Sequence, residues 1–189
     1  MAINMKYKWI EKEMTYDGTQ LRSGFAPKLA QSEPDCMIAF IGPANVPIEN
    51  MVDLEDVEAN EHIYSELMLH FLIEHKTKDL PLGVARQRML CAITADILME
   101  NKNAKNIRRL GDDLYDEDKK LSVSIATNSP NTTCIHFAMN IKSENTPVKT
   151  IGLYDYEIDP KNLAEKIMTA YTEEIESMNK AVGKVKFVT

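Results

Sequence analysis

A predicted strand in the middle of the chain carries a lysine and two serines at alternate positions. Residues 119–127 read KKLSVSIAT, and because alternate residues of a strand share a face, Lys120, Ser122 and Ser124 point the same way. The lysine supplies a positive charge, and the small hydroxyl side chains leave room for a flat ligand beside the backbone. This face predicts a site for a small molecule with a negative charge, whereas the neighbouring Lys119 should point to solvent.

The strand that follows adds a histidine and an asparagine. Residues 133–141 read TCIHFAMNI, in which His136 and Asn140 share a face by the same alternation. If the hairpin turns near Pro130, even-numbered residues lie opposite each other, which puts the asparagine beside Lys120 and the histidine beside the second serine. We therefore expect one small, polar face on which ligand contacts converge. A merely hydrated face is the alternative, because antiparallel sheets commonly have one wet side.

The elements that must hold this face alternate between two sequence periods. A period of two predicts strands, and a period near 3.6 predicts helices. A long helix should begin at Asp53 or Asp56, and the LPLG segment at 80–83 should separate it from a second helix. The pattern predicts an α+β fold, a mostly antiparallel sheet with helices packed on one side. The expected strands are 6–10, 36–42, 107–115, 119–127 and 133–141, with 150–158 as a further candidate, and the expected helices are 53–72, 84–100 and 160–183.

The last of these helices has the clearest local signals. Asp159 can cap its N-terminus, Pro160 suits its first position, and Gly183 suits its C-terminal end. Apolar residues recur between them at helical spacing, which predicts a helix with one buried face.

Composition limits the classes of function. The chain has 189 residues, of which 44% are hydrophobic and 27% charged, so residues 1–189 should form a single domain with one sizeable core. The formal net charge is -7. Broad electrostatic attraction to nucleic acid or to an anionic membrane surface is therefore not expected, although a local basic site is allowed.

The cysteines and the apolar runs indicate a compartment. Cys36, Cys91 and Cys134 are odd in number and widely spaced, and no CxxC pair exists, so neither a disulfide framework nor a cysteine-rich zinc site is expected. No apolar run approaches the ~18 residues of a membrane span, and the N-terminus lacks the apolar core of a signal peptide. We expect a soluble, cytoplasmic protein.

Three short motifs stand at fixed spacing within residues 111–141. They are DDLY at 112–115, KKLS at 119–122 and AMNI at 138–141. This segment resembles the core of the biotin and lipoate protein ligases, which show Asn-Asp-Leu-Tyr, then Arg-Lys-Leu-Ala/Ser-Gly, and later a strand ending in Gly-Ile-Asn-Val. It is also similar to the related octanoyltransferases, whose second strand ends much like HFAMN, and whose Thr-Tyr-His-Gly segment is weakly similar to TYDGTQL at 15–21.

The resemblance implies a ligase-like fold with a two-part site. Lys120 would contact the carboxylate of an acyl ligand such as lipoate, octanoate or biotin, or the phosphate of its adenylate, and stabilise charge as the acyl group moves to a lysine of an acceptor protein. Arg22 and Gly24 would lie on a loop that covers the ligand. Asp113 would lie near the ligand's ring or amide edge, although an acid at this position is equally explained as a turn former. The implied cofactor is ATP or an acyl-adenylate.

Three departures from the pattern weaken the implied activity. Val123 stands where the ligases have a glycine that lets the ligand approach closely. The ligases' long Arg- and Gly-rich loop is reduced to residues 22–24. Ile151 stands near the position of the transferases' nucleophilic cysteine, so covalent thioester chemistry is not expected there. The overall pattern is also similar to an uncharacterised archaeal family of hypothetical proteins, which brings no function with it.

Two other functions stay open. A binding module could keep the fold and the ligand contacts without catalysis. A metal-dependent hydrolase could use His62, Glu66 and His70, which would share one face of the long helix predicted there. Metal sites usually draw ligands from more than one element, so no metal site is expected.

Overall fold

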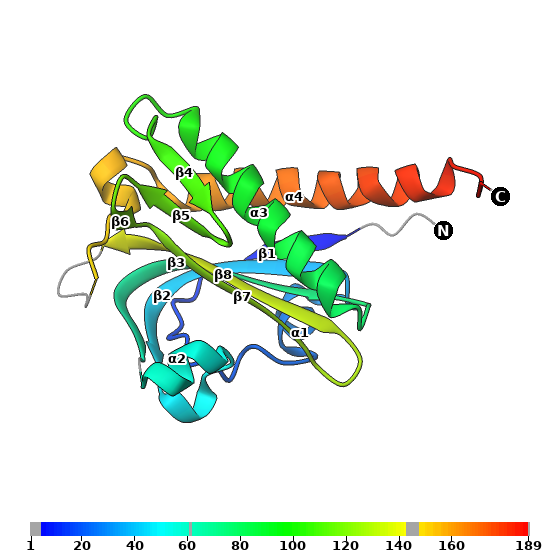
Figure 1. The fold of residues 1–189 in the computed structure, drawn as a ribbon, viewed down its shortest axis with the longest axis horizontal. Coiled ribbons are helices and arrows are strands. Elements are labelled where there is room, and N and C mark those ends of the chain that lie inside the picture. The colour runs from blue at the N-terminus through cyan, green and yellow to red at the C-terminus, as the bar shows by residue number, and fades with distance from the viewer. Residues whose placement is uncertain (1–4, 61, 143–147, 189) are drawn as a thin grey trace.

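A five-stranded sheet forms the centre of the molecule (Figure 1). The computed structural model describes residues 5–60, 62–142 and 148–188. The strand order is β1-β2-β3-β8-β7, with β1 parallel to β2 and the other neighbours antiparallel. The strands are β1 (Lys6–Trp9), β2 (Cys36–Val46), β3 (Ile63–His75), β7 (Ser122–Asn128) and β8 (Thr133–Lys142).

Two long helices cover one face of this sheet (Figure 1). They are α3 (Leu80–Met99) and α4 (Pro160–Gly183), which pack on each other and on the sheet. The main core lies between them and the sheet, and its fully buried side chains include Phe71, Phe137, Leu90, Leu98, Ile167 and Tyr171. No helix of the described residues has both the length and the apolar character of a membrane span.

The opposite face of the sheet is covered only in part. The short helix α1 (Phe25–Ala30) and the chain before it pack there on a second apolar cluster that includes Tyr16, Phe40 and Leu72. The 3-10 turn η1 (Ile48–Asn50) and the helix α2 (Leu54–Ala59) lie on the same side (Figure 1). The part of this face that they leave uncovered becomes the floor of a cavity.

A second, small sheet stands at one edge of that cavity. It consists of β4 (Ile107–Leu110), β5 (Asp113–Asp116) and β6 (Lys119–Lys120), all antiparallel. Only Leu121 separates β6 from β7, and its backbone N–H donates to the carbonyl of Leu114 at 2.8 Å. The small sheet therefore positions Lys120 near the first residue of β7 in the main sheet.

The α+β prediction is confirmed, but the long helix predicted at 53–72 is wrong. The helix α2 ends at Ala59 and is capped by Asn60, which has a left-handed conformation with φ of 54°, and the strand β3 begins at Ile63. The apolar run at 67–73 belongs to a central strand buried on both faces, and such a continuous run also fits a helix.

Other elements have different bounds in the structure from those predicted. The helix expected at 84–100 begins at Leu80, because Asp79 caps it by accepting from Leu82 N–H at 3.1 Å and a proline fits its first turn. The strand expected at 107–115 is two short strands joined by a turn at Gly111 and Asp112, and the φ of Gly111 is 65°. The candidate strand at 150–158 does not form, and the 3-10 turn η2 (Leu153–Tyr156) lies within that segment.

The final helix confirms its prediction. Asp159 caps it by accepting from Asn162 N–H at 2.8 Å, Pro160 is its first residue, and Gly183 is its last. That residues 1–189 form one domain stays a prediction.

The register predicted for the β7–β8 hairpin is wrong by one residue. The two strands pair from Asn128 and Thr133 outward, so the loop between them has an even number of residues and even-numbered residues meet odd-numbered ones. Ser124 lies opposite Phe137, on the face covered by α3. Because side chains alternate along a strand, this single step moves the serines away from the face that carries the histidine.

Candidate functional site

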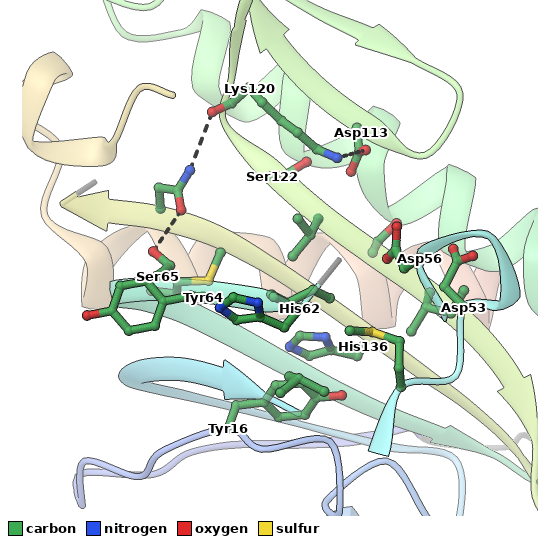
Figure 2. A pocket seen from close by; sticks show the side chains of 18 of the residues that line it. Tyr16, Asp53, Asp56, His62, Tyr64, Ser65, Asp113, Lys120, Ser122 and His136 are labelled. Carbon is green, nitrogen blue, oxygen red and sulfur yellow. Dashed lines mark hydrogen bonds and ion pairs between the residues drawn. The ribbon is translucent and has the colours of Figure 1, made fainter. Parts of the chain in front are cut away.

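The uncovered face of the sheet forms the floor of a cavity of about 650 Å³ (Figure 2). Strands β3, β7 and β8 form the floor, with Met68, Val123, His136 and Asn140 among its residues. The walls come from β5 and β6, from α2 with the chain on either side of it, and from Tyr16 and its neighbours. The cavity thus joins segments that are far apart in the sequence.

Lys120 and Asp113 form an ion pair at one wall. The Lys120 Nζ lies 2.7 Å from Asp113 Oδ2, and the two side chains are 30% and 17% exposed. Burial raises the pKa of Asp113 although Lys120 opposes that rise. Burial acts to lower the pKa of Lys120, but the carboxylate outweighs it and the net change is upward. We conclude that the lysine is charged and partnered.

Asn140 fixes the backbone beside this lysine. Its side-chain nitrogen donates to the carbonyl of Lys120 at 3.4 Å, and its side-chain oxygen accepts from Ser65 Oγ at 3.0 Å (Figure 2). Asn140 therefore lies near Lys120, as predicted, but the contact is with the backbone and not with the ammonium group. The asparagine links β8, β3 and β6 at the cavity.

Ser122 and Ser124 line the cavity, but their hydroxyls are engaged in the protein. Ser122 Oγ accepts from Leu114 N–H at 2.8 Å. Ser124 Oγ donates to the carbonyl of Asp112 at 2.8 Å and accepts from Gln87 Nε2 at 2.7 Å. The prediction that Ser124 lies beside His136 is wrong, because the shifted register places Ile125 opposite that histidine.

The loop predicted to cover the ligand does line the cavity, but not through the two residues that were expected to do so. Gly18 and Leu21 line it, whereas Arg22 is exposed and is absent from the lining, as is Gly24. Buried Glu74 accepts from Gly24 N–H at 2.8 Å and from Ser23 Oγ at 3.0 Å, which holds that part of the loop at the far end of the sheet. The structure does not bring Arg22 and Gly24 together with Lys120.

Tyr16 lines the cavity although the sequence did not point to it, and His70, considered only as a metal ligand, lies behind the lining. Tyr16 belongs to the TYDGTQL segment, and its ring stacks on His136 with centroids 3.8 Å apart. His70 lies directly behind His136, with His70 Nδ1 3.0 Å from His136 Nε2. Tyr16 lies in a segment that was considered as a loop and as a weak motif match, and His70 was assigned to a helix that does not form.

The residues proposed for a metal site do not converge. His62 precedes β3, and Glu66 and His70 lie within it. A strand rises ~3.3 Å per residue, so eight positions separate the two histidines by roughly 26 Å. Within the described residues no group of three or more His, Cys, Asp or Glu side chains could hold a metal ion. The helical geometry behind the hydrolase hypothesis is therefore wrong.

The positions considered for covalent chemistry hold no activated thiol. Ile151 is buried in the main core. Cys134 is 3% exposed, and burial raises the pKa of its thiol to about 11. A thiol must ionise to act as a strong nucleophile, so Cys134 is protonated near neutral pH and unsuited to that role.

The two buried histidines should make stability depend on pH. Burial lowers the pKa of His70 to about 4, from an ordinary value near 6.5, and lowers that of His136 in the same direction. Below pH ~6.5 the unfolded chain gains protons that the folded chain does not, so stability falls with falling pH. Between pH 7 and pH 5 we expect His70 alone to lower the free energy of unfolding by about 2 kcal/mol.

Urea unfolding at these two pH values, in the wild type and in His70→Gln, checks this expectation. The wild type should lose stability on acidification, and the variant should lose less. An equal slope in both proteins would show that His70 does not contribute.

The fold is that of the biotin and lipoate protein ligases. A mutant biotin protein ligase from Aquifex aeolicus in complex with biotin superimposes with a TM-score of 0.62 at 14% identity, over 93% of this chain and 72% of that one. The same ligase in complex with biotin and ATP gives a TM-score of 0.57 at 14% identity, over 91% and 70%. A putative lipoate protein ligase from T. acidophilum with bound lipoic acid gives 0.55 at 12% identity, over 90% and 86%.

Sequence relatives define the family within this fold. Residues 5–186 match the family described as Domain of unknown function (DUF366), so the chain belongs to that family. It is 34% identical over 187 residues to the uncharacterised protein MJ0805 of Methanocaldococcus jannaschii, covering 95% of this chain and 84% of that one. A protein of unknown function from Pyrococcus horikoshi has a TM-score of 0.89 at 34% identity, over 97% and 100%. The expected likeness to an uncharacterised archaeal family is confirmed.

Proposed function

We propose that this protein binds a small organic acid in the cavity, with the acid's carboxylate on Lys120. The observation that supports this proposal is the placement of Lys120, whose side chain is 30% exposed, at the wall of a cavity of about 650 Å³. An ammonium group has three N–H donors and gives one to Asp113, so others remain for a ligand. Biotin and lipoic acid, which proteins of this fold bind, are both carboxylic acids.

The charge of the cavity limits the ligand. Both lysines of the lining are paired with aspartates, Lys120 with Asp113 and Lys149 with Asp118. A ligand with one negative charge fits this balance better than a nucleotide triphosphate, whose repulsion by the remaining carboxylates would oppose binding. The lining carboxylates are Asp53, Glu55, Asp56, Asp112, Asp113 and Asp118.

Ligation or acyl transfer is a second candidate function. The pairing of Asp113 with Lys120 favours it, because these residues belong to the two motifs shared with the ligases. ATP or an acyl-adenylate would then be the cofactor, and a lysine of an acceptor protein would receive the acyl group. Lys120 would stabilise the charge that develops on the carboxylate or phosphate oxygen. A binding module without catalysis requires only the first proposal.

A screen of melting temperature tests the first proposal. Biotin, lipoate, octanoate and their adenylates are each added to the purified protein. An acid that binds the folded state stabilises it, by about 2.7 kcal/mol at one hundred times its dissociation constant. At least one acid should raise the melting temperature. If none of them does so at millimolar concentration, a carboxylate site on Lys120 is ruled out for this class of ligand.

Exchange of radioactive pyrophosphate into ATP separates the two candidate functions. An enzyme that forms an adenylate should catalyse this exchange in the presence of its acid, and Lys120→Ala should abolish it. An acid that stabilises the protein without supporting exchange would favour the binding module and would contradict adenylation.

A further inference from the structure

Two buried histidines stand one behind the other at the cavity floor. His136 lies on β8, is 3% exposed and lines the cavity. His70 lies on β3, is fully buried, and its Nδ1 is 3.0 Å from His136 Nε2. On its other side, His70 Nε2 is 3.1 Å from the carbonyl oxygen of Gly42. The three groups form a hydrogen-bonded row that begins at the backbone of β2 and ends at the cavity.

The row has one possible direction when both rings are neutral. A carbonyl oxygen can only accept, so His70 must carry its proton on Nε2 and donate to Gly42. A neutral imidazole has a single N–H, which leaves His70 Nδ1 as an acceptor. His136 must therefore donate from Nε2 to His70, and its own Nδ1 carries a lone pair.

Burial keeps both rings neutral. It lowers the pKa of His70 to about 4, and it lowers that of His136 well below the ordinary value, with the neighbouring His70 as a further cause. At pH 7 the doubly protonated forms are therefore disfavoured. Fixed tautomers follow from the hydrogen bonds and from the neutral charge together.

The free nitrogen of His136 is held in place. The Tyr16 ring stacks on the imidazole at 3.8 Å between centroids and 16° between planes, and both side chains lie at the cavity in Figure 2. Turning the imidazole over would remove the Nε2–H that His70 accepts. Among the residues that the structure describes, none donates a hydrogen bond to His136 Nδ1. His136 also lines the cavity, so a ligand there can donate to this nitrogen the hydrogen bond that no described residue provides.

We propose that the cavity selects a ligand that presents a hydrogen-bond donor to His136 Nδ1, such as the N–H of an amide, imide or ureido group. A carboxylate, phosphate or bare carbonyl is excluded from this position because its lone pairs would face the lone pair of the imidazole. This inference rests on the proposed function for the presence of a ligand, and it orients that ligand. The acid end lies at Lys120, and the N–H end lies over His136 and Tyr16.

The tautomers of His70 and His136 can be determined by NMR in the protein without a ligand. Long-range nitrogen–proton NMR spectra of the wild type at pH 7 should show His70 and His136 neutral, each protonated on Nε2 and bare on Nδ1. A proton on His136 Nδ1, or a charged ring, would overturn the inference. This measurement uses the unaltered protein and so does not depend on a variant that folds.

A matched pair of small rings tests the selectivity. 2-Imidazolidinone and cyclopentanone have nearly the same shape, and only the first carries N–H groups. We expect 2-imidazolidinone to bind roughly tenfold more tightly, as expected for one additional hydrogen bond. In His136→Phe, which keeps an aromatic ring beneath Tyr16, the two rings should bind equally. Equal binding of both rings to the wild type would contradict the inference.

The two proposals can fail separately. Neither ring carries a carboxylate, so their difference in affinity does not involve Lys120. If acids bind at Lys120 while the two rings bind equally, the orientation over His136 is wrong and the proposed function stands. If the rings are distinguished and no acid binds, the selectivity stands and the proposed function fails.

Discussion

Gly42→Ala is expected to lower the free energy of unfolding by about 3 kcal/mol, because the added carbon has no space. A Cβ at this position would lie 1.8 Å from the carbonyl oxygen of Met14 and 2.6 Å from its carbonyl carbon. Backbone hydrogen bonds fix the segment that would have to move, with Met14 N–H donating to Ile41 at 3.2 Å and Tyr16 N–H to Pro43 at 2.9 Å. The clash is between backbones, so no side-chain rotation relieves it.

Thermal unfolding of this variant checks the expectation. For a chain of this size, a loss of about 3 kcal/mol corresponds to a melting temperature lower by roughly 6–12 °C. Gly183→Ala is the matched control, because no heavy atom lies within 4 Å of a Cβ built there. That control should change stability by less than ~1 kcal/mol. A Gly42→Ala variant as stable as the control would show that the Met14 backbone does not lie in close contact with Gly42 of β2.

Lys120→Ala is expected to weaken acid binding at least tenfold and to destabilise the protein by about 1–2 kcal/mol. The first effect follows from loss of the ammonium that holds the carboxylate. The second follows because Asp113, which is 17% exposed, loses its partner at 2.7 Å, while its other carboxylate oxygen is buried without one. The expected loss of stability is small because the Lys120 side chain is partly exposed, and solvent screens its interaction with Asp113.

Two further variants separate these effects. Lys119→Ala removes a neighbouring charge that is exposed to solvent, and it should leave both acid binding and stability nearly unchanged. Asp113→Ala combined with Lys120→Ala removes the unpaired carboxylate and should regain stability without regaining acid binding. Calorimetric titration and urea unfolding measure the two quantities. Binding that survives in the double variant would mean that the carboxylate lies elsewhere.

Capping residues and periodicity in the sequence were enough to predict an element that is decided by its own residues. The helix at 160–183 follows from the cap Asp159 and the proline after it, and the structure agrees. The helix could be predicted because the residues that decide it are close in sequence. The approach of Asn140 to Lys120 was also expected, but from a hairpin register that is wrong by one residue, and the contact is made by the Lys120 carbonyl.

The remaining errors have physical causes that one sequence does not reveal. The apolar run at 67–73 fits a helix and a buried strand equally well, and only pairing with β2 and β8 decides between them. The hairpin register depends on whether its loop holds an odd or an even number of residues, and one step exchanged the faces of Ser124 and Ile125. The row from His70 to His136 stayed hidden for the same two reasons.

Mapping the binding site by NMR tests the central claim most directly. The isotope-labelled protein is titrated with biotin, and its backbone amide shifts are followed residue by residue. We predict that the largest changes fall on the cavity floor and on the wall at Lys120, from β3, β6, β7 and β8. Changes confined to the opposite face, under α3 and α4, or saturable binding with no change at the cavity, would contradict a ligand site anchored by Lys120.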